Sequence, residues 1–158
     1  MPFTAGQKLR ASDLNILSRV AFKTSTQTVN NSITLVNDTQ LFISVAANTN
    51  CIFTSRFVYT SGTTPDIKFG FTYPVGAVGS YTLTGTGAGG AVLAAFHQTE
   101  TSVSALEGSS GAACTMVGSW TIGTSAGIIQ LRWAQNTADP TNTQVLPGSF
   151  IRLDQVGT

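Results

Sequence analysis

A chain of 158 residues suits a single domain, because this length buries enough surface for one hydrophobic core. Charged residues make up only 9% of the chain and the formal net charge is +1, which argues against the concentrated basic surface that nucleic-acid binding needs. A neutral composition with abundant Gly and Thr is typical of all-β proteins that pack against copies of themselves or against neighbouring proteins. We therefore expect an oligomer and no nucleic-acid partner.

The first part of the chain differs in charge from the rest. Within residues 1–23 four basic side chains stand against Asp13 alone, whereas the remainder has four basic and six acidic residues. The four basic residues are Lys8, Arg10, Arg19 and Lys23. No apolar run resembles a secretory signal or approaches the roughly 18 residues of a membrane helix. We expect a soluble protein that is made in the cytosol and does not insert into a membrane.

A short helix is predicted near the amino terminus. Ser12 is a suitable N-cap, Asp13 complements the positive helix end, and apolar residues follow on one side. These apolar residues are Leu14, Ile16, Leu17 and Val20. Two turns are too few for a stable isolated helix, so it must dock, either on a partner or on its own domain. Residues 21–31 predict a linker or a first edge strand.

From residue 32 the pattern predicts about eight to ten short strands in a sandwich or barrel. Asn37-Asp38 indicates a turn between the first two strands. Residues 50–74 predict a hairpin whose strands alternate apolar and polar positions; it holds six of the twelve Phe and Tyr residues, so we expect it at the centre of the core. Tyr81 to Leu83 and residues 91–96 predict two further strands.

Residues 113–136 predict a second hairpin, which turns at residues 123–127. Ile151 and Leu153 alternate with Arg152 and Asp154 in the predicted last strand.

Few residues indicate chemistry. Residues 85–90 match GxGxxG, but strand-like residues follow where a dinucleotide site needs a helix, so a loop is the preferred interpretation. His97 is the only histidine, and the acidic residues are too scattered for a calcium-binding loop. Cys51 and Cys114 predict two buried thiols, with a disulfide or a reactive thiol as the alternatives. We therefore expect no enzyme activity, no catalytic residues, no metal and no cofactor.

The sequence FTAGQKLRASDLNIL resembles a tag found on many virion proteins of tailed bacteriophages, chiefly minor tail proteins, tail fibres and head fibres of phages that infect actinobacteria. The matching positions are Gly6, Leu9, Ala11, Leu14 and Asn15. The segments NDTQLFISVAANTNCIFTSRFVYT, DIKFGFTYPVGA and QVLPGSFIRLDQV are similar to the β domain that often follows this tag. The resemblance covers nearly the whole chain, although Cys51 stands where an aromatic residue is common.

The resemblance implies an antiparallel β-sandwich of the jelly-roll type seen in tumour necrosis factor, with a short N-terminal helix. Residues 1–31 would form an N-terminal virion-anchoring segment and linker, and residues 32–158 the β-sandwich domain. In such domains an aromatic and aliphatic face of each protomer meets on a threefold axis, so the resemblance also implies a homotrimer.

The function that the resemblance implies is that of a non-enzymatic bacteriophage virion structural protein, a capsid decoration or head-fibre protein on the virion exterior. Its partner would be the major capsid protein or a tail protein. Apolar anchor residues would enter a groove on that partner, and basic ones would meet an acidic surface. The anchor residues would be Phe3, Lys8, Leu9, Arg10, Leu14 and Leu17.

The alternative is a minor tail or tail-fibre protein that binds a host-surface carbohydrate. Aromatic rings of such a site would stack on sugar rings, and the candidates are Trp120, Trp133 and Tyr59. The competing interpretation places both Trp residues in the core, where large aromatic side chains bury most of their surface.

Overall fold

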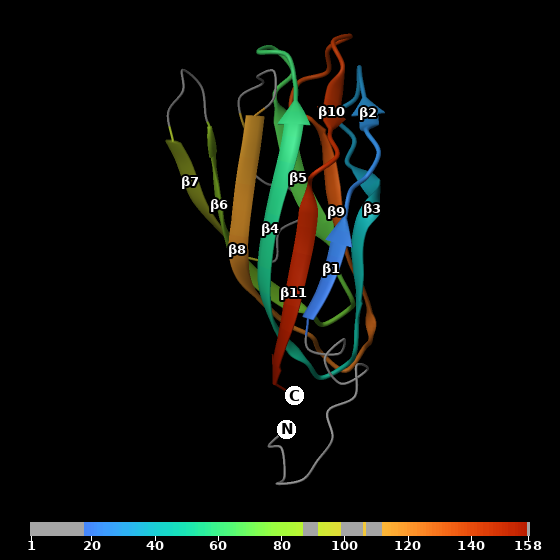
Figure 1. The fold of residues 1–158 in the computed structure, drawn as a ribbon, viewed down its shortest axis with the longest axis vertical. Helices are drawn as coiled ribbons and strands as arrows, with labels where there is room; N and C mark the ends of the chain where they lie inside the picture. Colours follow the sequence, from blue (N-terminus) through green and yellow to red (C-terminus); the bar gives the residue numbers. More distant parts are fainter. Residues whose placement is uncertain (1–17, 87–91, 99–105, 107–111, 158) are drawn as a thin grey trace, which may run out of the picture.

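In the computed structural model the chain folds as an antiparallel β-sandwich (Figure 1). The structure describes residues 18–86, 92–98, 106 and 112–157. These residues form eleven strands and no helix, which confirms the predicted all-β sandwich. The strands are β1 (Ser18–Phe22), β2 (Gln27–Val29), β3 (Val36–Val45), β4 (Asn50–Thr60), β5 (Ile67–Thr72), β6 (Val78–Thr86), β7 (Val92–Gln98), β8 (Ala112–Thr121), β9 (Gly127–Gln135), β10 (Thr143–Val145) and β11 (Phe150–Gly157).

Two sheets face each other across the core. The large sheet has eight strands in the order β1-β11-β4-β8-β6-β7, with β10 beside β4 and β2 beside β10, and the small sheet has the order β3-β9-β5. Along the chain, β3, β5 and β9 belong to the small sheet, whereas β4, β8 and β11 belong to the large one. This repeated crossing between two facing sheets agrees with the jelly-roll form of the sandwich.

The aromatic segment 50–74 is split between the two sheets, so the predicted hairpin is wrong. β4 lies in the large sheet and β5 in the small sheet, and residues 61–66 cross between them. The predicted alternation holds, because the apolar parity of each strand faces inward. Phe53 meets Phe71 edge to face with ring centroids 5.3 Å apart, and Phe57 stacks on Phe69 at 5.4 Å. The aromatic rings of β4 and β5 therefore pack against each other in the core between the two sheets.

The second predicted hairpin is wrong for the same reason. β8 pairs with β4 and β6 in the large sheet, whereas β9 pairs with β3 and β5 in the small one. The turn at residues 123–126 thus changes sheets. By contrast, the strands predicted around Tyr81 and at residues 91–96 are confirmed as the antiparallel pair β6 and β7.

The turn predicted at Asn37-Asp38 is a bulge inside one strand. β3 runs through both residues, and its register with β9 shifts between Asn37 and Phe42. Both residues are local turn formers, but Asp38 here is fully buried and accepts hydrogen bonds from the backbone N–H groups of Gln40 and Leu41. The side chain thus stabilises the bulge instead of reversing the chain.

The first described strand begins inside the segment that was expected to precede the sandwich. β1 pairs with β11 along the edge of the large sheet, and β2 pairs with β10, so residues 18–29 contribute two strands. Val20, which was placed on the predicted helix, lies in β1. The rest of that helix falls on residues 12–17, outside the described residues.

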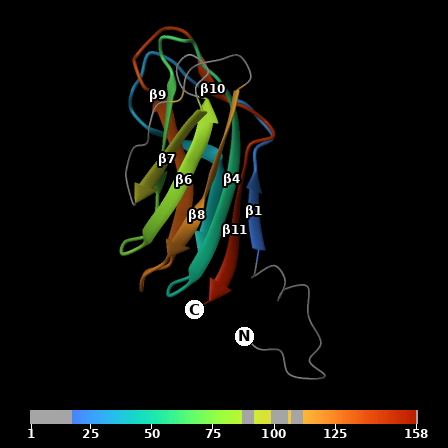
Figure 2. The same ribbon diagram turned by 90° about the vertical axis from the view of Figure 1, so that its left-hand side faces the viewer.

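The open side of the sandwich lies beyond β5, where β6 and β7 extend the large sheet; Figure 2 shows this pair in front. Leu106 fills part of this space. It is fully buried, and it exchanges two backbone hydrogen bonds with Ile67 of β5, at 2.8 and 3.1 Å. Its methyl groups also lie against Gly85 of β6, where an added Cβ would come within 3.0 Å of them. Leu106 therefore connects the two sheets.

The two ends of the sandwich differ. β1 begins and β11 ends at the same end, since Ser18 pairs with Asp154 (Figure 1). The connections at residues 61–66 and 136–142 lie at the other end, where Asn136 and Thr137 donate backbone hydrogen bonds to the carbonyl oxygen of Pro65. The segment before Ser18 therefore enters the sandwich opposite these loops.

Candidate interaction surface

The predicted anchor residues precede the described part of the chain. Phe3, Lys8, Leu9, Arg10, Leu14 and Leu17 all lie outside the described residues. Their point of attachment is described: Ser18 opens β1, an edge strand of the large sheet. Arg19 and Lys23, the other two basic residues of this region, lie within the sandwich, and the guanidinium of Arg19 donates a hydrogen bond to the carbonyl oxygen of Ser44. Lys23 is completely buried.

The aromatic residues proposed for sugar stacking are core residues. Tyr59, Trp120 and Trp133 expose no more than 1% of their surface. Trp120 packs edge to face on Phe71 with ring centroids 6.0 Å apart, and it lies 5.3 Å from the ring of Tyr73. The structure thus corrects the sugar-stacking proposal, because none of the three rings offers a face to a ligand. The core interpretation of both Trp residues is confirmed.

Both cysteines are buried and free, as the preferred interpretation predicted. Burial raises the pKa of the Cys51 thiol, and it raises the pKa of Cys114 to about 12. A thiol with a raised pKa holds little thiolate at neutral pH, and the thiolate is the reactive form. Both thiols therefore hold less thiolate at neutral pH than an exposed cysteine would.

A buried ion pair between Lys23 and Asp38 was not predicted. The ammonium of Lys23 donates to both carboxylate oxygens of Asp38, at 2.8 and 2.9 Å, and both side chains are completely buried. The indole N–H of Trp133 donates to the same carboxylate at 3.3 Å. Lys23 directly follows β1 of the large sheet and Asp38 lies in β3 of the small sheet, so the pair connects the sheets where β1 approaches β3.

The signal for this pair is weak in the sequence. Asp38 has the same parity as Val36 but precedes the bulge that shifts the parity to Leu41, Ile43 and Val45. A charged residue on an inward-facing position needs a partner of opposite charge, yet nothing local points to Lys23, which is 15 residues away.

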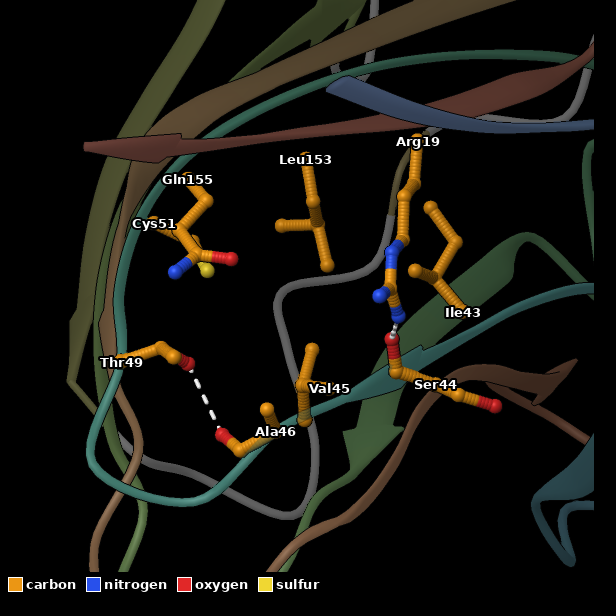
Figure 3. Close-up of a pocket in the computed structure, with 9 residues that line it drawn as sticks. All are labelled: Arg19, Ile43, Ser44, Val45, Ala46, Thr49, Cys51, Leu153 and Gln155. Atoms are coloured by element: carbon orange, nitrogen blue, oxygen red, sulfur yellow. Dashed lines mark hydrogen bonds between the residues drawn. The ribbon is translucent and has the colours of Figure 1, made fainter. Parts of the chain in front are cut away.

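A small cavity lies next to β1 and is shown in Figure 3. Its volume of about 10 Å³ is roughly enough for one water molecule. The figure shows the Arg19 side chain reaching Ser44, and the Thr49 hydroxyl donating to the carbonyl oxygen of Ala46 at 2.8 Å. The lining residues are Arg19, Ile43, Ser44, Val45, Ala46, Thr49, Cys51, Leu153 and Gln155. The space is too small for an organic ligand.

Other candidate sites have the wrong setting for chemistry. The GxGxxG match at residues 85–90 falls between two antiparallel strands, β6 and β7, and not between a strand and a helix. His97 lies within β7, in register with Tyr81. Among the described residues, no group of three or more His, Cys, Asp and Glu could hold a metal ion. The same residues include no helix that is long and apolar enough to cross a membrane.

The outer face of the large sheet is the candidate interaction surface. We define this face by the outward-pointing residues of β1, β11, β4, β8 and β6, and Figure 1 looks onto these strands. Six of the ten large apolar side chains exposed in the described residues lie on it. They are Val20, Phe22, Ile52, Val78, Val117 and Val156. Apolar surface gathered on one face is typical of an interaction site.

Strand register places these residues in continuous rows across the face. Val20 lies beside Arg152, then Thr54, Val117 and Thr82 follow on successive strands. Threonine and serine fill most remaining positions. Among its described side chains the face carries three charges, Arg56, Arg152 and Asp154. Arg152 pairs with Asp154 at 2.9 Å.

No protein-family model and no curated protein matches the sequence. Among solved structures, the chain is similar to the tripod from the baseplate of bacteriophage Tuc2009, with 9% identity and a TM-score of 0.39 over 99% of this chain and 73% of that chain. It is also similar to the infectious bursal disease virus Gx strain, with 10% identity and a TM-score of 0.26 over 89% of this chain and 39% of that one. Similarities at these TM-scores carry no functional argument.

Proposed function

We propose that the chain is a non-enzymatic structural protein of a bacteriophage virion, a capsid decoration or head-fibre protein that forms a homotrimer on the virion exterior. The observation that carries the proposal is the amino-terminal tag, with Gly6, Leu9, Ala11, Leu14 and Asn15 at its matching positions. The tag directly precedes β1, so it enters the sandwich at one end. A tag in this position can hold the sandwich by one end and leave the loops at the other end facing outward.

The proposed anchor works by simple complementarity. Phe3, Leu9, Leu14 and Leu17 would fill an apolar groove on the major capsid protein or a tail protein, and Lys8 and Arg10 would meet acidic groups beside it. Three tags on one trimer would bind together, so modest affinity of each tag would still give a stable attachment. Stabilising the anchor in this way requires no enzymatic group, cofactor or metal.

Localisation on intact virions tests the proposal. Phage particles that carry the full chain are compared by cryo-electron microscopy with particles that carry a chain lacking residues 1–17. The deletion stops before Ser18, because a longer one would remove strand β1 and the buried Lys23. A matched control replaces Lys8 and Arg10 with Glu and leaves the apolar anchor residues in place.

The expected result is density on the head that the deletion abolishes and the charge reversal weakens. Density that survives the deletion contradicts the anchoring role of the tag. Absence of the full chain from the particle would overturn the proposed function altogether.

Density at the tail tip would favour the alternative, a tail-fibre or minor tail protein that binds host carbohydrate. The loop end opposite Ser18 offers amide and hydroxyl groups for such binding, and a buried side chain orders it. Gln135 donates to the carbonyl oxygens of Asp139 and Thr141, at 3.0 and 2.7 Å, and accepts from the N–H of Ser32. Glycan-array binding that Gln135→Ala reduces would support this alternative.

A further inference from the structure

We infer that copies of this chain meet through the outer face of the large sheet, with Ile52 and Val117 near the centre of the contact. The inference rests on the proposed homotrimer and assigns a surface to it. The occupant of the face is a second copy of the same chain.

The composition of the face is unusual for a surface in contact with water. Val117 and Ile52 expose 54% and 47% of their surface, and they lie on the adjacent strands β8 and β4. The apolar parity of β4 faces the core, so Ile52 interrupts the alternation expected for a strand with one face in water. A partner that covers Ile52 would remove its apolar surface from water, which favours association through this face.

The face is also close in size to a stable contact. Its five strands are spaced by about 4.8 Å, and each contributes about eight residues at roughly 3.4 Å per residue, so the face presents about 650 Å². A standard protein interface buries about 800 Å² on each partner. The face therefore offers roughly four-fifths of the area that a specific interface buries on one partner.

Its few charges complement one another between copies. Arg56 has no ion pair within the described residues, whereas Asp154 lies on the neighbouring strand two rows away. Around a threefold axis the contact is heterologous, so Arg56 of one copy would meet Asp154 of the next. Because the face carries both signs and little charge in total, it does not repel a copy of itself, and a strongly charged partner would find little complement on it.

The outer face of the small sheet is a poorer candidate. Phe42 and Ile128 are its exposed large apolar side chains among the described residues. Lys68 and Arg132 lie on the same three-stranded sheet. Ile128 nevertheless provides a matched control, since it is an exposed β-branched residue, 46% exposed, on the central strand β9.

The test compares the oligomeric state of full-length variants by size-exclusion chromatography with light scattering. Val117→Asp and Ile52→Asp place an unpaired charge in the proposed contact, whereas Ile128→Asp places the same charge on the other sheet. Thr115→Lys probes the same face from an exposed position that is already polar, so folding is preserved. Circular dichroism melts confirm that each variant is folded.

The expected result is a wild-type mass of three times 16.5 kDa, with Ile128→Asp unchanged. Val117→Asp, Ile52→Asp and Thr115→Lys should each have the mass of a single chain. Loss of a central contact weakens association by roughly 30-fold or more. A wild-type trimer that all four variants retain, or that Ile128→Asp disrupts equally, overturns the assignment of the face and leaves the trimer standing. A wild-type chain that is monomeric overturns both the trimer and this inference.

Discussion

At the scale of single residues, Lys23 and Asp38 place a full positive and a full negative charge where water cannot reach them. The carboxylate of Asp38 accepts bonds from the ammonium, two backbone N–H groups and the indole of Trp133, so its hydrogen-bonding capacity is well used. A buried pair of this kind contributes little compared with apolar residues of the same size, but either member alone is costly to bury.

Lys23→Met should therefore lower the free energy of unfolding by about 3–5 kcal/mol, because it leaves the Asp38 carboxylate buried without its cation. Urea denaturation measures the change. Adding Asp38→Asn, which removes the charge but keeps a hydrogen-bond acceptor, should recover part of the loss. Arg152→Met breaks an exposed pair and should cost less than about 1 kcal/mol. Equal losses for Lys23→Met and Arg152→Met would contradict the role of burial.

Cys114 gives the stability a dependence on alkaline pH. Its pKa is 9.0 in an unfolded chain and about 12 in the fold, because burial disfavours the thiolate. Between these values unfolding releases a proton, so the free energy of unfolding should fall by about 1.4 kcal/mol for each pH unit. The contribution is fully present below pH 9 and is lost as the pH rises toward 12.

Urea denaturation at several pH values from 8 to 10.5, in a reducing buffer, measures this slope. Cys114→Ala should reduce this slope by the contribution of about one proton, which is about 1.4 kcal/mol per pH unit. Identical slopes for the wild type and Cys114→Ala would show that the thiol does not titrate as its burial requires.

At the scale of elements, Leu106 connects β5 of the small sheet to β6 of the large one. Leu106→Ala should cost about 3–5 kcal/mol, because the lost methyl groups leave a cavity between Ile67 and Gly85. Chemical denaturation measures the loss, and hydrogen exchange at the Ile67 amide, which donates to Leu106, should become faster. Val75→Ala, at a side chain that is 85% exposed, is the control and should change stability by less than about 0.5 kcal/mol. An unchanged Ile67 amide would argue against Leu106 as the connection.

The elements also show what local pattern can and cannot predict. The inward parity of β4, with Phe53 and Phe57, follows from alternation along a single strand, and it was predicted correctly. The pairing of β4 with β5 was predicted wrongly. Two strands joined by a short connection show the same alternation of apolar and polar residues whether they share one sheet or face each other across the core. Residues 61–66 span the distance of about 10 Å between packed sheets, which makes the second solution possible.

The candidate surface was only partly foreseeable. Ile52 and Val117 stand on the outward parity of their strands, so the sequence contains the signal for a second apolar face. This second apolar face can be recognised only once the strand order is known, because that order places β1, β11, β4, β8 and β6 side by side. The Lys23–Asp38 pair and the burial of Leu106 depend on contacts between distant segments, which no local pattern specifies.

At the scale of the whole molecule, residues 18–23 belong to the described sandwich, since they hold β1 and the buried Lys23. A chain that begins at Ser18 keeps all eleven strands, so its thermal midpoint should stay within roughly 3 °C of the full chain at equal concentration. A chain that begins at Thr24 loses β1 and leaves Asp38 without Lys23, so its midpoint should fall by roughly 10 °C or more. Circular dichroism melts measure both. Equal midpoints would mean that β1 adds nothing to the sandwich.

The placement of the chain's entry and exit at one end of the sandwich also suggests a practical use. A peptide inserted between residues 136 and 142 would project from the end opposite Ser18, whereas a protein fused after the last strand would begin near Ser18. If the tag holds the protein on a phage shell, one chain could present an epitope outward and keep a second graft close to the particle. The sandwich would then serve as a display scaffold with two graft positions at different distances from the particle surface.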